Sequence, residues 1–167
     1  MADRVRDNLF LVNAPAGSGK TTTIYQRIEK LIREEHITSI LCITYTNRAV
    51  EELQRRLEGY SVKIMTIHAF LSEFMKSYFT NSKIVKLYLD LYKEKIERDK
   101  EKGEQSESGK YYREKYGELE YETITKNITK IYYNEREFNS LYDGGVGHDD
   151  LLSFSVEIEK KYPVVRT

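Results

Sequence analysis

Residues 14–21 read Ala14-Pro15-Ala16-Gly17-Ser18-Gly19-Lys20-Thr21. The four apolar residues before them, Leu9-Phe10-Leu11-Val12, indicate a buried strand. After them, residues 21–34 carry Ile and Leu side chains at helical spacing, which predicts a helix. A glycine-rich turn ending in Lys-Thr between a strand and a helix is the context that a phosphate-binding P-loop requires.

The residue types in this turn suit the binding of a nucleoside triphosphate. Gly17 and Gly19 allow the backbone to turn its N–H groups inward, and the start of the helix adds partial positive charge. Lys20 supplies a full charge, and the Thr21 hydroxyl is placed to hold Mg²⁺. The alternative is an ordinary glycine-rich turn with an exposed lysine. The predicted ATP-binding residues are Ala14, Pro15, Ala16, Gly17, Ser18, Gly19, Lys20, Thr21 and Thr22, with Lys20 and Thr21 as the catalytic residues and Thr21 as the Mg²⁺ ligand.

Further strands and helices alternate downstream of this loop. Residues 39–44 and 62–66 are short apolar runs, and residues 47–57 between them have helical periodicity. Strands that alternate with helices of this length predict an α/β fold with a parallel sheet covered on both faces.

The pattern becomes helical from about His68. Residues 98–110 are rich in Glu, Lys, Gly and Ser without an apolar anchor, which predicts a mobile loop. Residues 111–133 are predicted to be helical, and a last helix begins at Asp149-Asp150. We therefore expect a first domain at residues 1–70 and a helical subdomain at residues 71–162.

Composition excludes several classes of protein. Among 167 residues, Lys and Arg number 27 and Asp and Glu number 27, so the chain is not a strongly basic nucleic-acid binder, although a local basic or aromatic groove remains possible. No apolar run approaches the roughly 20 residues that a membrane span needs. The N-terminus has no apolar secretion signal, and the single cysteine cannot form an internal disulfide. These features predict a cytoplasmic location.

A P-loop by itself does not name the reaction, because a second acidic element usually helps to hold Mg²⁺. The nearest candidate is Leu87-Tyr88-Leu89-Asp90. Its apolar residues continue at helical spacing on both sides, so we predict a helix surface there and not a second acidic motif.

Three further segments are similar to motifs of one family. They are Ile43-Thr44-Tyr45-Thr46-Asn47-Arg48-Ala49-Val50-Glu51-Glu52-Leu53, Val62-Lys63-Ile64-Met65-Thr66-Ile67-His68-Ala69-Phe70 and His148-Asp149-Asp150-Leu151-Leu152. In this order after the P-loop, they resemble the UvrD/Rep family of superfamily 1 DNA helicases. The resemblance implies a RecA-like P-loop NTPase with a parallel sheet, incomplete in this chain, and an α-helical insertion subdomain.

The resemblance also implies roles in DNA binding. Tyr45 matches an aromatic residue that stacks on a base of single-stranded DNA, a mode of binding that tolerates any sequence. Without the motif, Tyr45 reads as an ordinary aromatic residue at a strand end, and His68 as a residue that caps a helix. The positions that match contacts near the DNA backbone are Thr44, Asn47, Thr66 and His68.

The function implied is that of an ATP-dependent DNA helicase or translocase that uses ATP and Mg²⁺ on single-stranded DNA, in repair or phage defence. A partner nuclease or repair protein is expected. Because the sequence ends at Thr167, before the family's next acidic motif, we expect this chain alone to hydrolyse ATP negligibly. Residues 1–8 contain no Gln, so selectivity for adenine is not predicted.

Two other functions remain open. A small P-loop kinase would need a lid over the phosphates, for which residues 98–113 are the candidate. A nucleotide-binding partner module without turnover would fit the neutral net charge.

Overall fold

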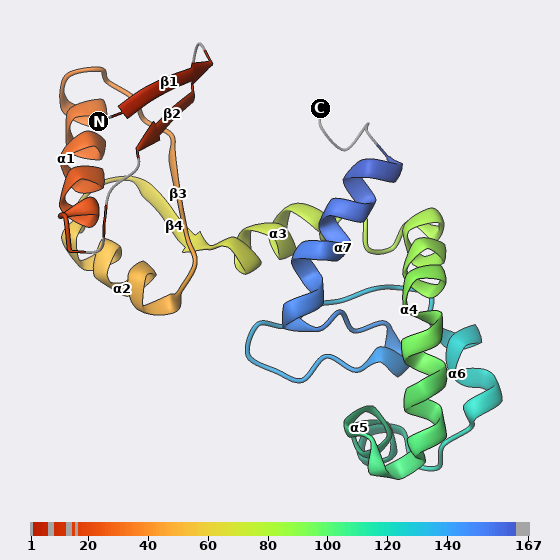
Figure 1. Ribbon diagram of the computed structural model, residues 1–167. Helices are drawn as coiled ribbons and strands as arrows, with labels where there is room; N and C mark the ends of the chain where they lie inside the picture. Colours follow the sequence, from red (N-terminus) through yellow and green to blue (C-terminus); the bar gives the residue numbers. More distant parts are fainter. Residues whose placement is uncertain (1, 7–8, 13–14, 16, 163–167) are drawn as a thin grey trace. The chain divides into compact units, whose positions relative to one another are not determined.

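The computed structural model describes residues 2–6, 9–12, 15 and 17–162 (Figure 1). The chain divides into two compact units, Met1–Thr66 and Ile67–Thr167. The division falls just before residue 70, where the sequence predicts the end of the first domain.

A two-stranded antiparallel sheet opens the first unit. Strands β1 (Ala2–Arg6) and β2 (Leu9–Val12) pair with Ala2 opposite Val12. The strand predicted at Leu9–Val12 is confirmed, but its expected place in the parallel sheet is wrong. Antiparallel neighbours need only a short connection, whereas parallel pairing needs a long crossover, so β2 pairs with the strand directly before it.

Strands β3 (Ile40–Thr44) and β4 (Val62–Thr66) form a parallel pair in which Ile40 lies opposite Val62 and Thr44 opposite Thr66. Helix α2 (Asn47–Arg56) is the crossover between them, and it packs on β4. The predicted strands at residues 39–44 and 62–66 and the helix between them are therefore confirmed.

Only one face of this sheet is covered. Exposure alternates along β3, and Leu41 and Ile43 are 45% and 39% exposed. The prediction of a sheet covered on both faces is therefore wrong for the part of the chain that the structure describes. Successive side chains of a strand point to opposite faces, so an alternating pattern is what helices on one side produce.

Helix α1 (Lys20–Arg33) follows the glycine-rich turn and buries Ile28, while α2 buries Leu53. Helix α2 begins at a well-made cap, because the Thr46 hydroxyl accepts a hydrogen bond from the N–H of Ala49. Thus α1 and α2 both begin within the segments that carry the predicted site.

The second unit is helical. Its longest helix, α4 (Ser82–Lys102), buries a row of side chains that includes Tyr88, Tyr92 and Ile96. Leu87 to Asp90 lie inside this helix, as predicted, and Asp90 is exposed on its surface, whereas Leu87 and Tyr88 are buried in the core. The helices are α3 (Ile67–Met75), α4 (Ser82–Lys102), α5 (Glu107–Tyr116), α6 (Tyr121–Asn127) and α7 (His148–Lys161), with short 3₁₀ turns η1 (Gly103–Gln105) and η2 (Leu141–Asp143).

Residues 98–110 are not a loop. Helix α4 continues to Lys102, and α5 begins at Glu107 after one 3₁₀ turn. The Ser106 hydroxyl accepts a hydrogen bond from the N–H of Gly109 and caps α5. Glu and Lys are good helix formers, and Ile96 anchors the end of α4, so the absence of apolar residues within 98–110 was misleading. The helix predicted over 111–133 is also shorter than expected, because α5 ends at Tyr116 and α6 at Asn127.

An aromatic core holds α4, α7 and the loop before α7 together. Tyr88 is fully buried, and its hydroxyl contacts the carbonyl oxygens of Leu141 and Gly145, each at 3.1 Å. The ring of Phe154 from α7 meets the rings of Tyr88 and Tyr92 with centroids 6.0 Å apart. Burial raises the pKa of the Tyr88 hydroxyl, which therefore stays protonated and able to donate.

Candidate functional site

The glycine-rich turn lies between β2 and α1. Gly17 and Gly19 have φ angles of 77° and 79°, in the left-handed region that residues with a side chain rarely adopt. Apart from each glycine and its two chain neighbours, no heavy atom of the described residues lies within 4 Å of where a Cβ would stand, so the backbone there is open to a ligand. Ala14 and Ala16 of the predicted site lie outside the described residues.

Helix α1 starts immediately after Gly19, with Lys20 as its first residue. Its first turn contains no acidic residue, so nothing in that turn offsets the partial positive charge of the helix end. The exposed Lys20 ammonium donates a hydrogen bond to the carbonyl oxygen of Pro15 at 2.9 Å, which holds the side chain across the loop. N–H groups, helix dipole and ammonium together favour a phosphate-bearing anion.

Thr21 and Thr22 occupy the first turn of α1. Within the described residues, no group of three or more His, Cys, Asp or Glu side chains could hold a metal ion. A threonine hydroxyl is an oxygen ligand of the kind that Mg²⁺ accepts, and this ion usually keeps several waters and is bound together with substrate phosphates.

Arg56 is a residue near this turn that sequence reasoning missed. It lies in the last turn of α2, where its guanidinium contacts the Thr22 hydroxyl at 3.4 Å and pairs with Glu52 at 2.8 Å. Arg56 belongs to none of the sequence motifs. Its contact with Thr22, 34 residues away in the sequence, arises only through folding. The contact places a second cation beside the first turn of α1.

The carboxyl ends of β3 and β4 bring four of the five predicted DNA-binding residues to one edge. Thr44 and Thr66 are register partners, and the Thr44 hydroxyl donates to the carbonyl oxygen of Thr46 at 3.2 Å. Tyr45 follows β3 and is 75% exposed, and the exposed Asn47 begins α2. Ligands of open α/β sheets bind outside this edge of the strands.

His68, the fifth predicted residue, belongs to the second unit, where it is 4% exposed. Its ring stacks on that of His148, with centroids 3.7 Å apart and planes 18° apart. The Tyr133 hydroxyl lies 2.7 Å from Nδ1 of His148. Burial first, and then the charge of His148, lower the pKa of His68, so this imidazole is held neutral.

His148 is a second residue whose importance the sequence did not indicate. In the sequence it stands out only as the first residue of the segment 148–152, and the ring it stacks on, His68, is 80 positions earlier in the chain. Thr66, like His68, is only 4% exposed. Both therefore present little surface to a ligand, in contrast to Tyr45 and Asn47.

A strand, a turn with two left-handed glycines and a helix that begins with Lys-Thr define the P-loop class of phosphate-binding proteins. Residues 4–162 match the family described as the UvrD/REP helicase N-terminal domain. The chain belongs to this family.

Relatives that resemble the chain include the Gabija protein GajB of Bacillus cereus strain HuB5-5. It is 34% identical over 136 residues, which are 77% of this chain and 19% of GajB. The ATP-dependent DNA helicase PcrA of Bacillus subtilis strain 168 is 42% identical over 35% of this chain and 8% of PcrA. One subunit of the ATP-dependent helicase/nuclease from Pediococcus pentosaceus is 28% identical over 55% of this chain and 11% of that protein. The chain thus spans a fifth or less of the length of these relatives.

No solved structure matches the chain at a significant level. Among the helices of the described residues, none combines the length and the apolar character that crossing a bilayer would require.

Proposed function

We propose that this chain is the ATP-binding portion of an ATP-dependent DNA helicase that translocates on single-stranded DNA. The observation that carries the proposal is the turn with left-handed Gly17 and Gly19 directly before α1, with Lys20 at the positive end of that helix. Membership of the UvrD/REP family supports the same conclusion.

The turn and the first residues of α1 would hold the phosphates of ATP. Backbone N–H groups of the turn bind the phosphate oxygens, and the Lys20 ammonium neutralises part of their charge. The Thr21 hydroxyl is a ligand of the Mg²⁺ that accompanies the nucleotide. ATP supplies the free energy for movement when it is hydrolysed in the whole protein.

The edge formed by the ends of β3 and β4 would hold the DNA strand. Tyr45 offers an exposed ring on which a base can stack, and Asn47 offers an exposed amide for the backbone. Thr44, Thr66 and His68 complete the proposed set, with Thr66 and His68 acting from buried positions that orient the residues around them.

Repair or phage defence would be the setting, and a nuclease or repair protein the partner. The resemblance to Gabija protein GajB and to part of a helicase/nuclease supports a partner nuclease. By itself the 167-residue chain would turn over ATP negligibly, and measurable DNA-stimulated turnover by this chain alone would contradict that part of the proposal.

The test is strand separation by the full-length protein that carries this chain. We expect unwinding of a partial duplex with a single-stranded tail, dependent on both ATP and Mg²⁺. Thr21→Ala should abolish ATP turnover and unwinding, whereas Thr21→Ser keeps the hydroxyl and should retain both. Equal turnover by the two variants would remove Thr21 from the Mg²⁺ site, and unwinding without ATP would refute the helicase assignment.

A further inference from the structure

The second unit contains two hollows of similar size and different chemistry. Their volumes are about 660 Å³ and 600 Å³, and both lie within the range of about 300–1,000 Å³ that is typical of ligand sites. Every residue that lines either hollow belongs to the unit Ile67–Thr167. Volume does not distinguish them, so the side chains decide what each can bind.

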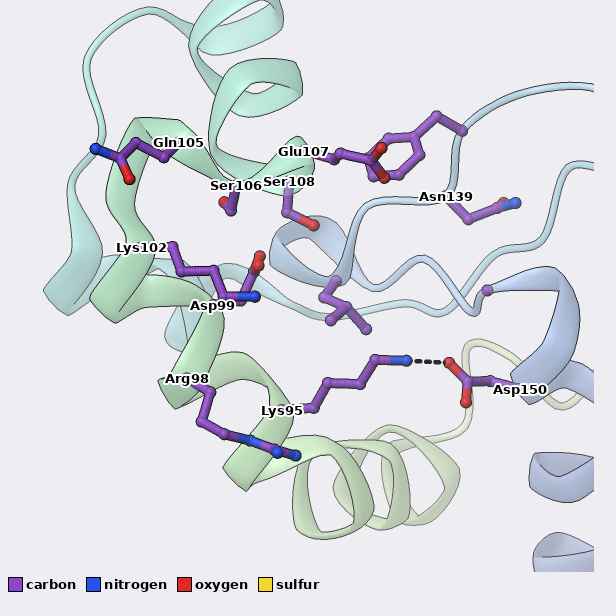
Figure 2. Close-up of a pocket in the computed structure, with 13 residues that line it drawn as sticks. Lys95, Arg98, Asp99, Lys102, Gln105, Ser106, Glu107, Ser108, Asn139 and Asp150 are labelled. Atoms are coloured by element: carbon purple, nitrogen blue, oxygen red, sulfur yellow. Dashed lines mark hydrogen bonds and ion pairs between the residues drawn. The ribbon is translucent and has the colours of Figure 1, made fainter.

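The larger hollow is balanced in charge (Figure 2). Lys95, at one side, is paired with Asp150 across the hollow at 2.5 Å. Phe138 is the sole aromatic residue in its lining. Three cations and three anions line it, namely Lys95, Arg98, Lys102, Asp99, Glu107 and Asp150. This hollow therefore favours no ligand charge.

The smaller hollow, which we call the tyrosine–lysine groove, is lined by aromatic rings and lysines. The tyrosines come from α5 and from the segment after α6, and they are Tyr111, Tyr116, Tyr132 and Tyr133. The lysines are Lys76, Lys115 and Lys130, against the two acids Glu137 and Asp143. Grooves that bind single-stranded nucleic acid combine aromatic rings, on which bases stack, with cations that contact the phosphates.

Lys115 holds two of these rings in place. Its ammonium lies 5.2 Å from the centroid of the Tyr111 ring and 5.0 Å from that of Tyr116, and it donates to the Tyr111 hydroxyl at 3.1 Å. Hydrogen bonds with Tyr116 and Tyr111 raise the pKa of Lys115, so its charge persists. The Tyr116 ring also meets that of Tyr112, with centroids 4.9 Å apart, but Tyr116 remains 53% exposed, so part of its ring is open to a ligand.

The acids of the groove have partners within the chain. Asp143 accepts hydrogen bonds from the hydroxyls of Tyr132 at 2.6 Å and Tyr116 at 3.3 Å, and its side chain is 13% exposed. Lys115 lies 3.3 Å from the same carboxylate, and Glu137 accepts from the Asn134 amide at 3.1 Å. Asp143 is therefore paired with Lys115, Glu137 keeps its charge, and the three lysines of the groove face two carboxylates.

The other two lysines of the groove, Lys76 and Lys130, are both exposed. Neither makes an ion pair within the residues that the structure describes. These two ammonium groups line the same groove as the exposed ring of Tyr116, and together they suit a chain of phosphates that carries unpaired bases. A duplex hides the faces of its bases, so it could meet the lysines but not stack on the tyrosines.

We propose that the tyrosine–lysine groove binds a segment of single-stranded DNA, with a base against Tyr116 and phosphates near Lys76 and Lys130. This contact lies in the second unit and is additional to the proposed strand edge at Tyr45. It rests on the proposed function only in taking DNA as the ligand.

The test measures affinity for a fluorescent oligothymidylate of about 10 nucleotides, a length within the usual site size of single-strand binders. The protein carries Tyr45→Ala throughout, so that the edge of the first unit contributes little. Tyr116→Ala should weaken binding about 5- to 150-fold, the range expected for loss of one stacked base, and Tyr116→Phe should retain the affinity. Circular dichroism verifies that each variant is folded.

A matched pair of double variants tests the lysines. Lys76→Ala with Lys130→Ala should reduce the slope of log affinity against log salt concentration by about 1.4, because each lost phosphate contact on a single strand contributes about 0.7. Arg98→Ala with Lys102→Ala removes the same charge from the other hollow and should leave the slope unchanged.

Three results would overturn the groove. The first is that Tyr116→Ala binds as tightly as the protein with Tyr45→Ala alone. The second is that the two double variants have equal salt slopes. The third is that duplex DNA binds as tightly as the single strand and loses as much affinity in Tyr116→Ala. If Tyr45→Ala abolishes binding by an otherwise unchanged protein, no affinity is left for the groove to supply, and only the groove fails. Absence of any single-strand binding by the wild-type protein refutes both the groove and the proposed function.

Discussion

The first unit leaves Leu41 and Ile43 of β3 exposed, whereas the second unit buries Leu151, Phe154 and Ile158 of α7 almost completely. The first unit carries nearly all the residues predicted to bind ATP and DNA, and the second carries the aromatic core. A binding motif and a well-covered core are therefore separate properties of this chain. A phosphate-binding turn needs only a strand, two glycines and the start of a helix. The core of the second unit requires side chains from several helices to pack against one another.

Loss of a core ring in the second unit should have the largest effect. Phe154 is 1% exposed and meets two tyrosine rings, so Phe154→Ala should lower the free energy of unfolding of this unit by about 3–5 kcal/mol. Hydrogen exchange resolved by segment measures this loss for each unit separately. ATP binding by the first unit should persist.

Two substitutions serve as controls for that prediction. Val156, on the same helix, is 46% exposed, and Leu41 in the first unit is 45% exposed. Val156→Ala and Leu41→Ala should each change stability by no more than about 0.5 kcal/mol. The contrast between the two units would be wrong if Leu41→Ala lowered the free energy of unfolding as much as Phe154→Ala, or if Phe154→Ala also abolished ATP binding.

The exposed ring at the edge of the first unit gives the next largest effect. Tyr45→Ala should weaken binding of single-stranded DNA by about 1–3 kcal/mol, because one stacked base is lost. Tyr45→Phe keeps the ring and should bind normally. Fluorescence anisotropy with oligonucleotides of two compositions measures both. A loss confined to one composition would argue against stacking, which tolerates every base.

A cap in the second unit tests the helical reassignment of residues 98–110. Ser106→Ala removes the acceptor for the N–H of Gly109 and should cost about 1 kcal/mol, with faster exchange of amides along α5. Ser153→Ala is the control, because Ser153 is exposed within α7 and caps no helix. Unchanged exchange along α5 in Ser106→Ala would show that the cap is not what starts this helix.

The smallest effect concerns the stacked histidines of the second unit. The pKa of His68 is lowered in the folded chain, so the unfolded chain takes up a proton near pH 6.5 and the folded chain only at lower pH. Stability from His68 is therefore full above about pH 6.5 and declines as the pH falls below it. The groups that face this ring are His148, Tyr133, Glu135 and Asp149.

Thermal unfolding of the second unit between pH 8 and pH 5 checks this sign. His68→Phe keeps an aromatic ring and removes the titration, so its stability should decline less over the same range. His36→Asn alters an exposed histidine of the first unit and should leave the decline in place. Greater stability of the wild-type chain at pH 5 than at pH 8 would contradict the lowered pKa.

Local patterns were enough to predict much of the first unit. Residues 62–66 form a strand with the predicted bounds, and helices α1 and α2 begin within one residue of the positions expected. The partner of β2 was not predictable in this way, because strand pairing depends on contacts between distant segments and not on the strand's own pattern. For the same reason, the sequence did not reveal that Leu41 would be exposed.

In the candidate site, the sequence located Gly17, Gly19, Lys20 and Tyr45 through their motifs, and the structure adds conformation and exposure. It did not locate Arg56, His148 or the tyrosine–lysine groove, since each depends on residues that are brought together only by folding. The prediction of a loop at 98–110 was wrong, because it relied on the Glu, Lys, Gly and Ser content of this segment and overlooked Ser106 as the cap of α5.

The measurement that tests the account most directly is calorimetric titration of Mg·ATP into the wild-type chain, the Lys20→Ala variant and the Lys30→Ala control. Lys30 lies on the same helix and pairs with Glu34 at 3.6 Å, away from the turn. We expect Lys20→Ala to weaken binding by about 1.5–3 kcal/mol, roughly 10- to 150-fold, with unchanged thermal unfolding, and Lys30→Ala to bind normally. Equal affinity of wild type and Lys20→Ala would contradict the phosphate-binding turn and the function built on it.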